Sequence, residues 1–179
     1  MRLTSDTTTL RRMRADDLMA FQAYRRDPAI ARFQNWEHMD DTRAAHFLHH
    51  SATVEPLLRP GHWTQIAVAD TETDALIGDI GLRIAKDEAE GETGITLAAA
   101  HHGRGHAQRA MHLAIGLMFR TTRIARIRAW ADIRNTKSVT MLHRVGFAFL
   151  GHEVTDGIKE AAFELRRDDH EPYAGCAHN

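Results

Sequence analysis

The segment Leu97–Ala107 joins a predicted strand to a predicted helix through two closely spaced glycines, Gly103 and Gly105. Small residues in such a turn leave backbone N–H groups unpaired at the positive end of the helix dipole. A turn of this kind can bind an anion, and phosphate suits it. It lacks the Gly-Lys-Ser/Thr ending of a P-loop and the glycine spacing of a dinucleotide fingerprint. The segment therefore indicates a phosphate site, with a merely tight connection as the alternative.

A second segment, Asn135–Phe147, strengthens the first interpretation. Asn135 can cap a helix, Gly146 can end it, and Phe147 enters the next strand. Taken alone, this segment could be a well-capped core helix.

Together, the two segments resemble the GNAT superfamily of acyl-CoA-dependent N-acyltransferases. The family signature Arg/Gln-x-x-Gly-x-Gly/Ala is matched by His102, Gly105 and Ala107, with His102 in place of Arg or Gln. The Asn-x-x-Ser helix that ends in Gly-Phe is similar to the RimJ/RimL-type branch, the ribosomal-protein-alanine N-acetyltransferases. The segments Ala75–Leu82 and Glu92–Leu97 are similar to that branch as well. The resemblance covers roughly residues 7–167.

The resemblance implies an α/β (α+β) fold, a mixed and mostly antiparallel twisted sheet of about six or seven strands with helices on both faces and a splayed cofactor cleft. It also implies acetyl-CoA as cosubstrate, with its diphosphate on the amides of His102–Ala107. The pantetheine arm is expected beside Ile95–Leu97, in a gap that faces the strand Ile124–Ala131. The residues expected to hold acetyl-CoA are Ile95, Thr96, Leu97, His102, Gly103, Arg104, Gly105, His106, Ala107, Asn135, Lys137 and Ser138.

Acetyl transfer by direct attack in a ternary complex needs a deprotonated primary amine and a polarised carbonyl oxygen. Glu92 is the first candidate for the residue that accepts the proton and Asp79 is the second, although either could be a carboxylate without a catalytic role. A backbone N–H near Leu97 would polarise the carbonyl. Many members of the family carry a tyrosine acid at the position of Leu142 here. We therefore expect no tyrosine acid in this chain.

Two residues of the second segment are expected near the cosubstrate. Ser138 could donate a hydrogen bond to the sulfur, and Asn135 could bind the pantetheine or cap its helix. A thiolate with a pKa of about 8.5 is a tolerable leaving group, so a weak acid or water can suffice.

Acidic residues border the expected cleft and favour a cationic amine: they are Asp79, Asp87, Glu88, Glu90 and Glu92. A protein or peptide N-terminal amine is the first acceptor to expect, because its pKa of about 7.7–8.0 makes it reactive without a strong base. A small polyamine-like or aminoglycoside-like amine is the second. A noncatalytic acyl-CoA-binding or sensor domain is the alternative, because the tyrosine is absent and His102 departs from the signature.

Thirteen histidines raise the question of a metal site. They include His46, His49 and His50 on one predicted helix, but no His-Glu-x-x-His motif or Cys/His set accompanies them. We expect exposed histidines and no metal. Four aromatic residues could line an acceptor pocket or belong to the core: Phe33, Trp36, Trp63 and Trp130.

The two segments lie within a chain of alternating predicted helices and strands. Apolar residues recur at 3- and 4-residue spacing over about Gly105–Arg120, which predicts a long helix. Further helices are predicted over about 16–26, 41–53 and 138–145. Strands are predicted over 7–13, 62–69, 75–84, 92–98, 124–131, 147–153 and 159–166. This alternation predicts a mixed sheet with helices on both faces.

Composition limits the class of protein further. With 23 Lys+Arg and 24 Asp+Glu in 179 residues, the net charge is −1, which argues against a nucleic-acid partner. Length and composition predict a single domain over residues 1–179. The resemblance implies that it is an acetyltransferase domain with a core at about 7–167 and a polar tail at 168–179. The only cysteine, Cys176, and the absence of a signal peptide or long apolar run predict a cytoplasmic protein without a membrane partner. Both a monomer and a homodimer are compatible with the sequence.

Overall fold

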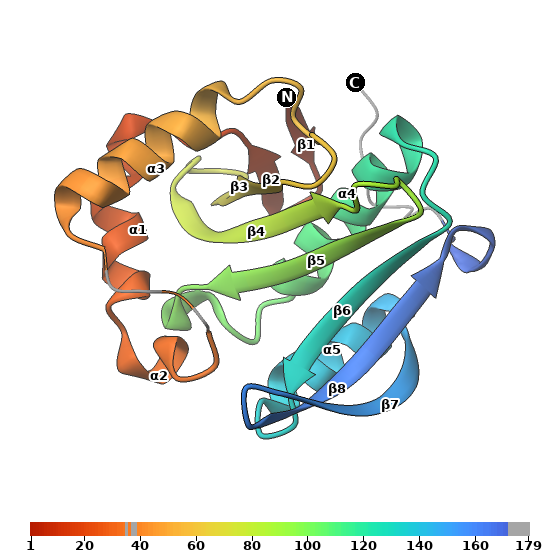
Figure 1. Ribbon diagram of the computed structural model, residues 1–179. Helices are drawn as coiled ribbons and strands as arrows, with labels where there is room; N and C mark the ends of the chain where they lie inside the picture. The colour runs from red at the N-terminus through yellow and green to blue at the C-terminus, as the bar shows by residue number, and fades with distance from the viewer. Residues whose placement is uncertain (35, 37–38, 172–179) are drawn as a thin grey trace.

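A computed structural model of the chain describes residues 1–34, 36 and 39–171. Within them, eight strands form one sheet in the order β1-β2-β3-β4-β5-β6-β8-β7 (Figure 1). The strands are β1 (Arg2–Thr4), β2 (Thr8–Arg11), β3 (Trp63–Asp70), β4 (Leu76–Ile84), β5 (Glu90–Leu97), β6 (Arg126–Asp132), β7 (Ala148–Thr155) and β8 (Ile158–Arg166). The predicted mixed fold is confirmed, but the sheet has more strands than the six or seven expected.

Neighbouring strands of the described sheet are antiparallel except for β5 and β6, which are parallel. The single parallel pair follows from the chain path, because α4 (His106–Thr121) connects these two strands as a crossover helix. The strand that the sequence did not predict is β1, a three-residue strand that pairs Leu3 with Leu10 of β2. Three residues are too few to show a period of two.

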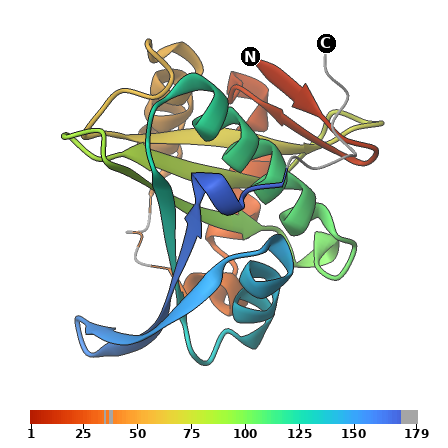
Figure 2. The same cartoon turned by 90° about the vertical axis from the view of Figure 1, so that its right-hand side faces the viewer.

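Helices cover both faces of the sheet (Figures 1 and 2). On one face, α4 and α5 (Thr136–Val145) pack on a core that includes Met111, Leu142 and Phe163. On the other face, α1 (Leu18–Arg25) and α3 (Asp41–Thr53) enclose a second core around Phe21 and Leu48. Both cores are built on the sheet, so the strands between them are held from two sides and can position a site with little freedom.

A short helix, α2 (Pro28–Ala31), was not predicted. The sequence Asp27-Pro28 indicated only the end of α1, because proline does not continue a helix. In the structure the same pair also starts the next helix: the Asp27 carboxylate accepts a hydrogen bond from the Ala29 N–H, and Pro28 occupies the first turn. As a result, Phe33 and Gln34, which follow α2, line a cavity together with Ile95–Leu97 at the carboxyl-terminal end of β5.

No helix within the described ranges is long and apolar enough to cross a membrane. The predicted polar tail begins with the short helix Arg167–Asp169, and its remainder with Cys176 lies outside the described residues.

Candidate active site

The sheet divides between β5 and β6. The two strands pair only from Glu90–Glu92 to Arg126–Arg128. Beyond that point, β5 stays paired to β4 up to Leu97, and β6 stays paired to β8 up to Asp132. The strands therefore diverge, and a gap opens between their carboxyl-terminal ends (Figure 1).

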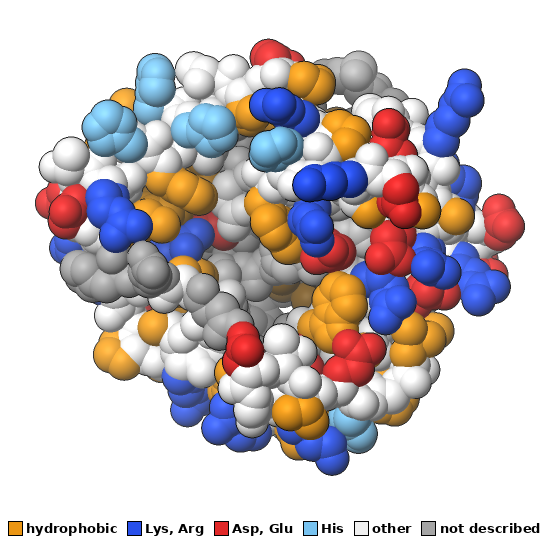
Figure 3. Space-filling view, in the orientation of Figure 1, with side chains coloured by type: hydrophobic (Ala, Val, Ile, Leu, Met, Phe, Trp, Pro, Cys, Tyr) orange, Lys and Arg blue, Asp and Glu red, His pale blue; other side chains and the backbone are white. Residues whose placement is uncertain are grey.

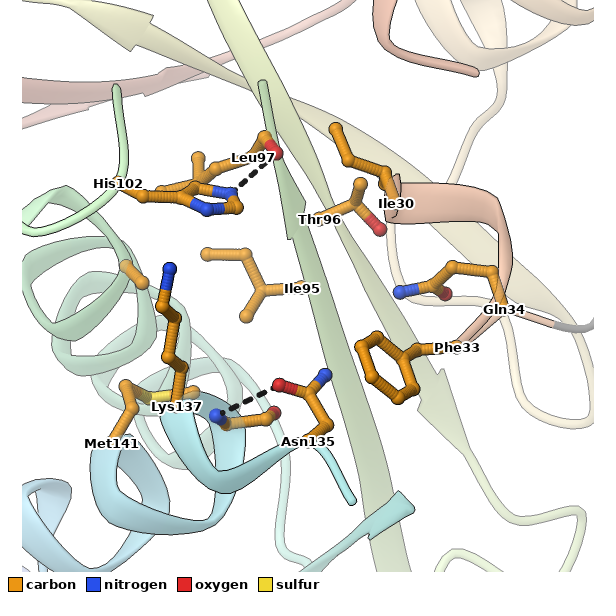
Figure 4. A pocket seen from close by; sticks show the side chains of 12 residues that line it. Ile30, Phe33, Gln34, Ile95, Thr96, Leu97, His102, Asn135, Lys137 and Met141 are labelled. Atoms are coloured by element: carbon orange, nitrogen blue, oxygen red, sulfur yellow. Dashed lines mark hydrogen bonds between the residues drawn. The ribbon is translucent and has the colours of Figure 1, made fainter. Parts of the chain in front are cut away.

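Backbone groups of β5 face this gap. In a strand, the N–H and C=O of one residue point to the same side, and alternate residues point to opposite sides. The Ala98 N–H donates to the Ile77 carbonyl of β4 at 2.9 Å, so the backbone groups of Leu97 point to the other side, where its carbonyl lies 2.9 Å from the Nε2 atom of His102 (Figure 4). Ile95, two residues earlier, therefore presents its N–H and C=O to the gap as well. His102 donates to the Leu97 carbonyl, a role that explains a histidine at this position of the signature.

The turn before α4 has the geometry of an anion site. Gly103 (φ +73°) and Gly105 (φ +81°) both adopt the left-handed conformation that favours glycine. Gly105 is the N-cap of α4 and supplies no side-chain hydrogen bond, so the first-turn amides of the helix are left for a ligand. A cavity of about 450 Å³ lies beside this turn. Its walls include Gly103 and Gly105 on one side and Lys137 and Arg144 of α5 on the other.

The cavity at the turn continues along β5. A second cavity, of about 130 Å³, shares Leu97, His102, Ala107, Lys137 and Met141 with the first. It adds the segment after α2 as a further wall (Figure 4). In Figure 4, the Lys137 side chain extends from α5 toward His102, so the two residues lie on opposite sides of this passage.

The start of α5 forms the middle of the passage. The Asn135 Oδ1 atom accepts a hydrogen bond from the Ser138 N–H at 3.2 Å, which caps the helix. The amide NH₂ of Asn135 is left as a donor. Both Asn135 and Ser138 line the second cavity and also a third, inner cavity of about 100 Å³ between the diverging strands. The three cavities therefore form one groove, from the turn before α4 to the gap between β5 and β6.

The inner cavity contains polar residues that the sequence did not single out. Asp132 at the end of β6 and Glu160 on β8 line it, with Gln34 from the segment after α2. Asp132 is held by the Arg134 side chain, whose hydrogen bonds keep the pKa of Asp132 below its ordinary value. Glu160 was not predicted because only the pairing of β6 with β8 places it opposite Asp132. Asp132 lies three residues before Asn135, where the second motif begins, and this was the one signal in the sequence.

Most residues expected to hold acetyl-CoA line this groove. Those that do are Ile95, Thr96, Leu97, His102, Gly103, Gly105, His106, Ala107, Asn135, Lys137 and Ser138. Arg104 does not line these three cavities, and its carbonyl accepts a hydrogen bond from Arg109 at 3.1 Å. His106 is buried and its Nδ1 atom lies 2.9 Å from the Thr8 hydroxyl. Burial lowers the pKa of His106 below its ordinary value, and the neighbouring His101 lowers it further by a smaller amount.

The two carboxylates proposed as bases lie away from these cavities. Asp79 is 1% exposed and accepts hydrogen bonds from Tyr24, Arg25 at 3.1 Å and Gln65 at 2.9 Å. Burial and the nearby Asp79 raise the pKa of Tyr24 well above its ordinary value, so Tyr24 stays a donor. Glu92 forms an ion pair with Arg83, its register partner on β4. Both carboxylates are therefore bound by other side chains: Asp79 by residues of α1 and β3, and Glu92 by a residue of β4.

The aromatic candidates separate into two groups. Phe33 and Trp130 line the inner cavity. Trp36 packs on the core of α1 and α3, with the Arg25 guanidinium 4.0 Å from its ring centroid, and Trp63 lies against Gly81 of β4. Among the described residues, no group of three or more His, Cys, Asp or Glu side chains is arranged to hold a metal ion.

Comparison with known proteins identifies the family. Residues 7–148 match the model of the acetyltransferase (GNAT) domain. The chain belongs to the GNAT acetyltransferases. It is 27% identical over 146 residues, 81% of each chain, to an uncharacterized N-acetyltransferase, p20, of Bacillus licheniformis. The family assignment confirms the prediction of an acetyl-CoA-dependent N-acetyltransferase.

Solved structures show the same fold at low sequence identity. A GNAT acetyltransferase of Bacillus anthracis superposes with a TM-score of 0.80 at 16% identity, over 94% of this chain and 99% of that chain. The ribosomal-protein-S5-alanine acetyltransferase of Vibrio fischeri superposes with a TM-score of 0.76 at 19% identity, over 96% and 100%. Other structures of this fold contain acetyl-CoA or coenzyme A. The resemblance to the RimJ/RimL-type branch thus extends to the whole fold.

Proposed function

We propose that this acetyltransferase binds acetyl-CoA along the groove from the turn before α4 to the gap between β5 and β6, and transfers the acetyl group to a primary amine by direct attack in a ternary complex. The observation that carries the proposal is the continuity of the three cavities: the first and second share His102 and Lys137, and the second and the inner cavity share Asn135 and Ser138. When bound, acetyl-CoA supplies the acetyl group as an activated thioester.

The residues present fit each part of the cosubstrate. The free first-turn amides of α4, with Lys137 and Arg144 across the cavity, suit a diphosphate. The backbone groups of Ile95 and the amide of Asn135 suit the amide-rich pantetheine arm. The groove is thus most cationic at the turn and most acidic at the inner cavity, where Asp132 and Glu160 lie.

Within this groove, the chain can assist the transfer in two ways. A backbone N–H of β5 that faces the gap, near Leu97 or at Ile95, can polarise the thioester carbonyl. The Ser138 hydroxyl, for which no hydrogen bond is found among the described residues, is free to donate to the sulfur as negative charge develops there. Glu92 and Asp79 remain candidates for the proton acceptor, but either would have to act through water, because neither lines the groove.

Thiol release measured with acetyl-CoA and a panel of amines tests the proposal. The panel contains a short peptide with a free N-terminal amine, a diamine and an alkyl monoamine. We expect release of coenzyme A above the hydrolysis background with at least one of them, and mass spectrometry should show an amine heavier by one acetyl group. Binding of acetyl-CoA in calorimetry without transfer to any amine would instead support the noncatalytic acyl-CoA-binding or sensor domain.

A further inference from the structure

Glu160 is the one carboxylate of the inner cavity without a partner in the described part of the chain. It lines the cavity on β8, opposite Asp132 of β6 and Glu153 of β7. Asp132 forms an ion pair with Arg134. Glu153 accepts a hydrogen bond from Trp130 Nε1 at 2.9 Å and lies 3.7 Å from Arg128. Each neighbour is thus compensated, whereas Glu160 adds one uncompensated negative charge to the wall of the groove.

The position of Glu160 suits a cation on the substrate. The side chains of Trp130, Asp132 and Glu160 all lie on the face of the sheet that carries α1 and α3, since they alternate with core residues such as Ala131 and Ala161. Figure 3 shows this side of the molecule hollowed near its centre, with acidic, basic and apolar side chains around the hollow. Glu160 and Ser138 line the same inner cavity, so an acceptor bound there can contact both.

The charge of the reacting nitrogen limits what Glu160 can bind. An amine attacks only after it has lost its proton, and a nearby carboxylate favours the protonated form. A carboxylate held against the reacting nitrogen would therefore oppose the reaction. A carboxylate held against a second ammonium, which stays charged throughout, would bind and orient the acceptor without that penalty.

We propose that Glu160 binds a second, nonreacting ammonium of the acceptor, and that the acceptor class is a small aliphatic diamine or polyamine. This inference rests on the proposed acetyl transfer and specifies which class of amine accepts the acetyl group. The inner cavity has a volume of about 100 Å³, which is room for a short alkyl chain. Most of its exposed lining is polar, and three apolar side chains in it, Phe33, Met111 and Leu142, can contact the methylene groups between two nitrogens.

A comparison of two substrates in two proteins tests this role. The substrates are 1,4-diaminobutane and 1-aminopentane, which have the same length and differ in one terminal charge. We expect the wild type to prefer the diamine in kcat/KM by about tenfold or more, the range typical of a hydrogen-bonded charge. Glu160→Gln should remove this preference through the KM of the diamine, while the monoamine and the KM for acetyl-CoA change by less than about twofold.

Glu164→Gln is the matched control. Glu164 lies on the same strand and the same face, but its carboxylate has arginine partners, Arg166 at 3.0 Å and Arg126 at 3.5 Å, and it does not line the groove. We expect this variant to keep the diamine preference. Added salt provides a second measurement in the wild type alone, because screening should reduce the diamine preference and leave the monoamine unchanged.

The outcomes distinguish the inference from the function on which it rests. Equal kcat/KM for diamine and monoamine in the wild type, with transfer to both, would overturn the role of Glu160 and leave acetyl transfer standing. A diamine preference that survives in Glu160→Gln would overturn it as well. Binding of acetyl-CoA without transfer to any amine would overturn the proposed function itself.

Discussion

The turn before α4 offers the sharpest test of where coenzyme A binds, through the substitution Gly105→Val. Gly105 has φ +81° and serves as the N-cap of α4. A Cβ atom at this position would lie 2.3 Å from the Nη1 atom of Arg109, which donates to the Arg104 carbonyl. Valine therefore has to displace the guanidinium and also adopt the left-handed conformation.

The expected loss of affinity follows from the backbone strain, because the Arg109 guanidinium ends a flexible side chain and can move aside. The left-handed conformation costs an L-residue about 1–2 kcal/mol, and a β-branched side chain is at the unfavourable end. The turn can relieve this strain only by rotating its peptide groups, which turns first-turn N–H groups away from the cavity. One hydrogen bond to a charged group contributes about 1.5–3 kcal/mol. We therefore expect the affinity for coenzyme A to fall by tenfold or more, about 1.4 kcal/mol.

Gly157→Val separates backbone strain from binding. Gly157, in the turn between β7 and β8, has φ +77°, and a Cβ atom there would meet nothing within 4 Å. Both variants should lose stability in urea unfolding, and calorimetry with coenzyme A should show weaker binding only for Gly105→Val. Unchanged affinity in a folded Gly105→Val variant would refute a diphosphate site at this turn.

Three further substitutions test the remaining parts of the site. Ser138→Ala should lower kcat more than it raises the KM for acetyl-CoA, because a donor to the developing thiolate acts mainly in the transition state; a change in KM alone would make Ser138 a binding or capping residue. Asp79→Asn should reduce the free energy of unfolding by about 3 kcal/mol, because it removes the buried charge paired with Arg25, whereas a fall in kcat at unchanged stability would make Asp79 the base. Burial lowers the pKa of His106, so the unfolded chain binds more protons at this residue than the folded chain does. The free energy of unfolding should therefore keep its full value above about pH 6.5 and decrease as the pH falls through the folded pKa. His106→Gln should make that decline shallower in thermal unfolding across pH 5–8, and an unchanged slope would mean that His106 does not contribute to it.

The fold could be predicted where the sequence has a clear period or a clear cap. The apolar spacing in α4 places Ala110, Met111, Ala114 and Met118 in the core, as the helix pattern required. The elements that were missed, β1 and α2, have three and four residues. Elements this short carry no period, and their existence depends on a partner strand or on one capping side chain.

The binding half of the site could be predicted better than the catalytic half. The turn and the start of α5 depend on local residues, so the glycines and Asn135 were visible in the sequence. The surroundings of a carboxylate depend instead on contacts between distant segments. Asp79 lies under Tyr24, 55 positions earlier in the chain, and Glu160 reaches the groove only because β8 returns beside β6. No local pattern distinguishes these two residues from a surface carboxylate.

The division of the sheet gives a physical reason for the groove itself. β5 is paired with β4 from Gly91 to Leu97, and β6 is paired with β8 from Arg126 to Asp132, so each half of the sheet is held without the other. Where the halves diverge, the backbone groups of Ile95 that face the gap have no strand to bond to, and such groups are stabilised when they are paired. A ligand with amides spaced along an extended chain could pair with them and bridge the two halves. Coenzyme A has such an arm, and an amine alone does not, so we expect the acetyl donor to complete this part of the site before the acceptor occupies the inner cavity.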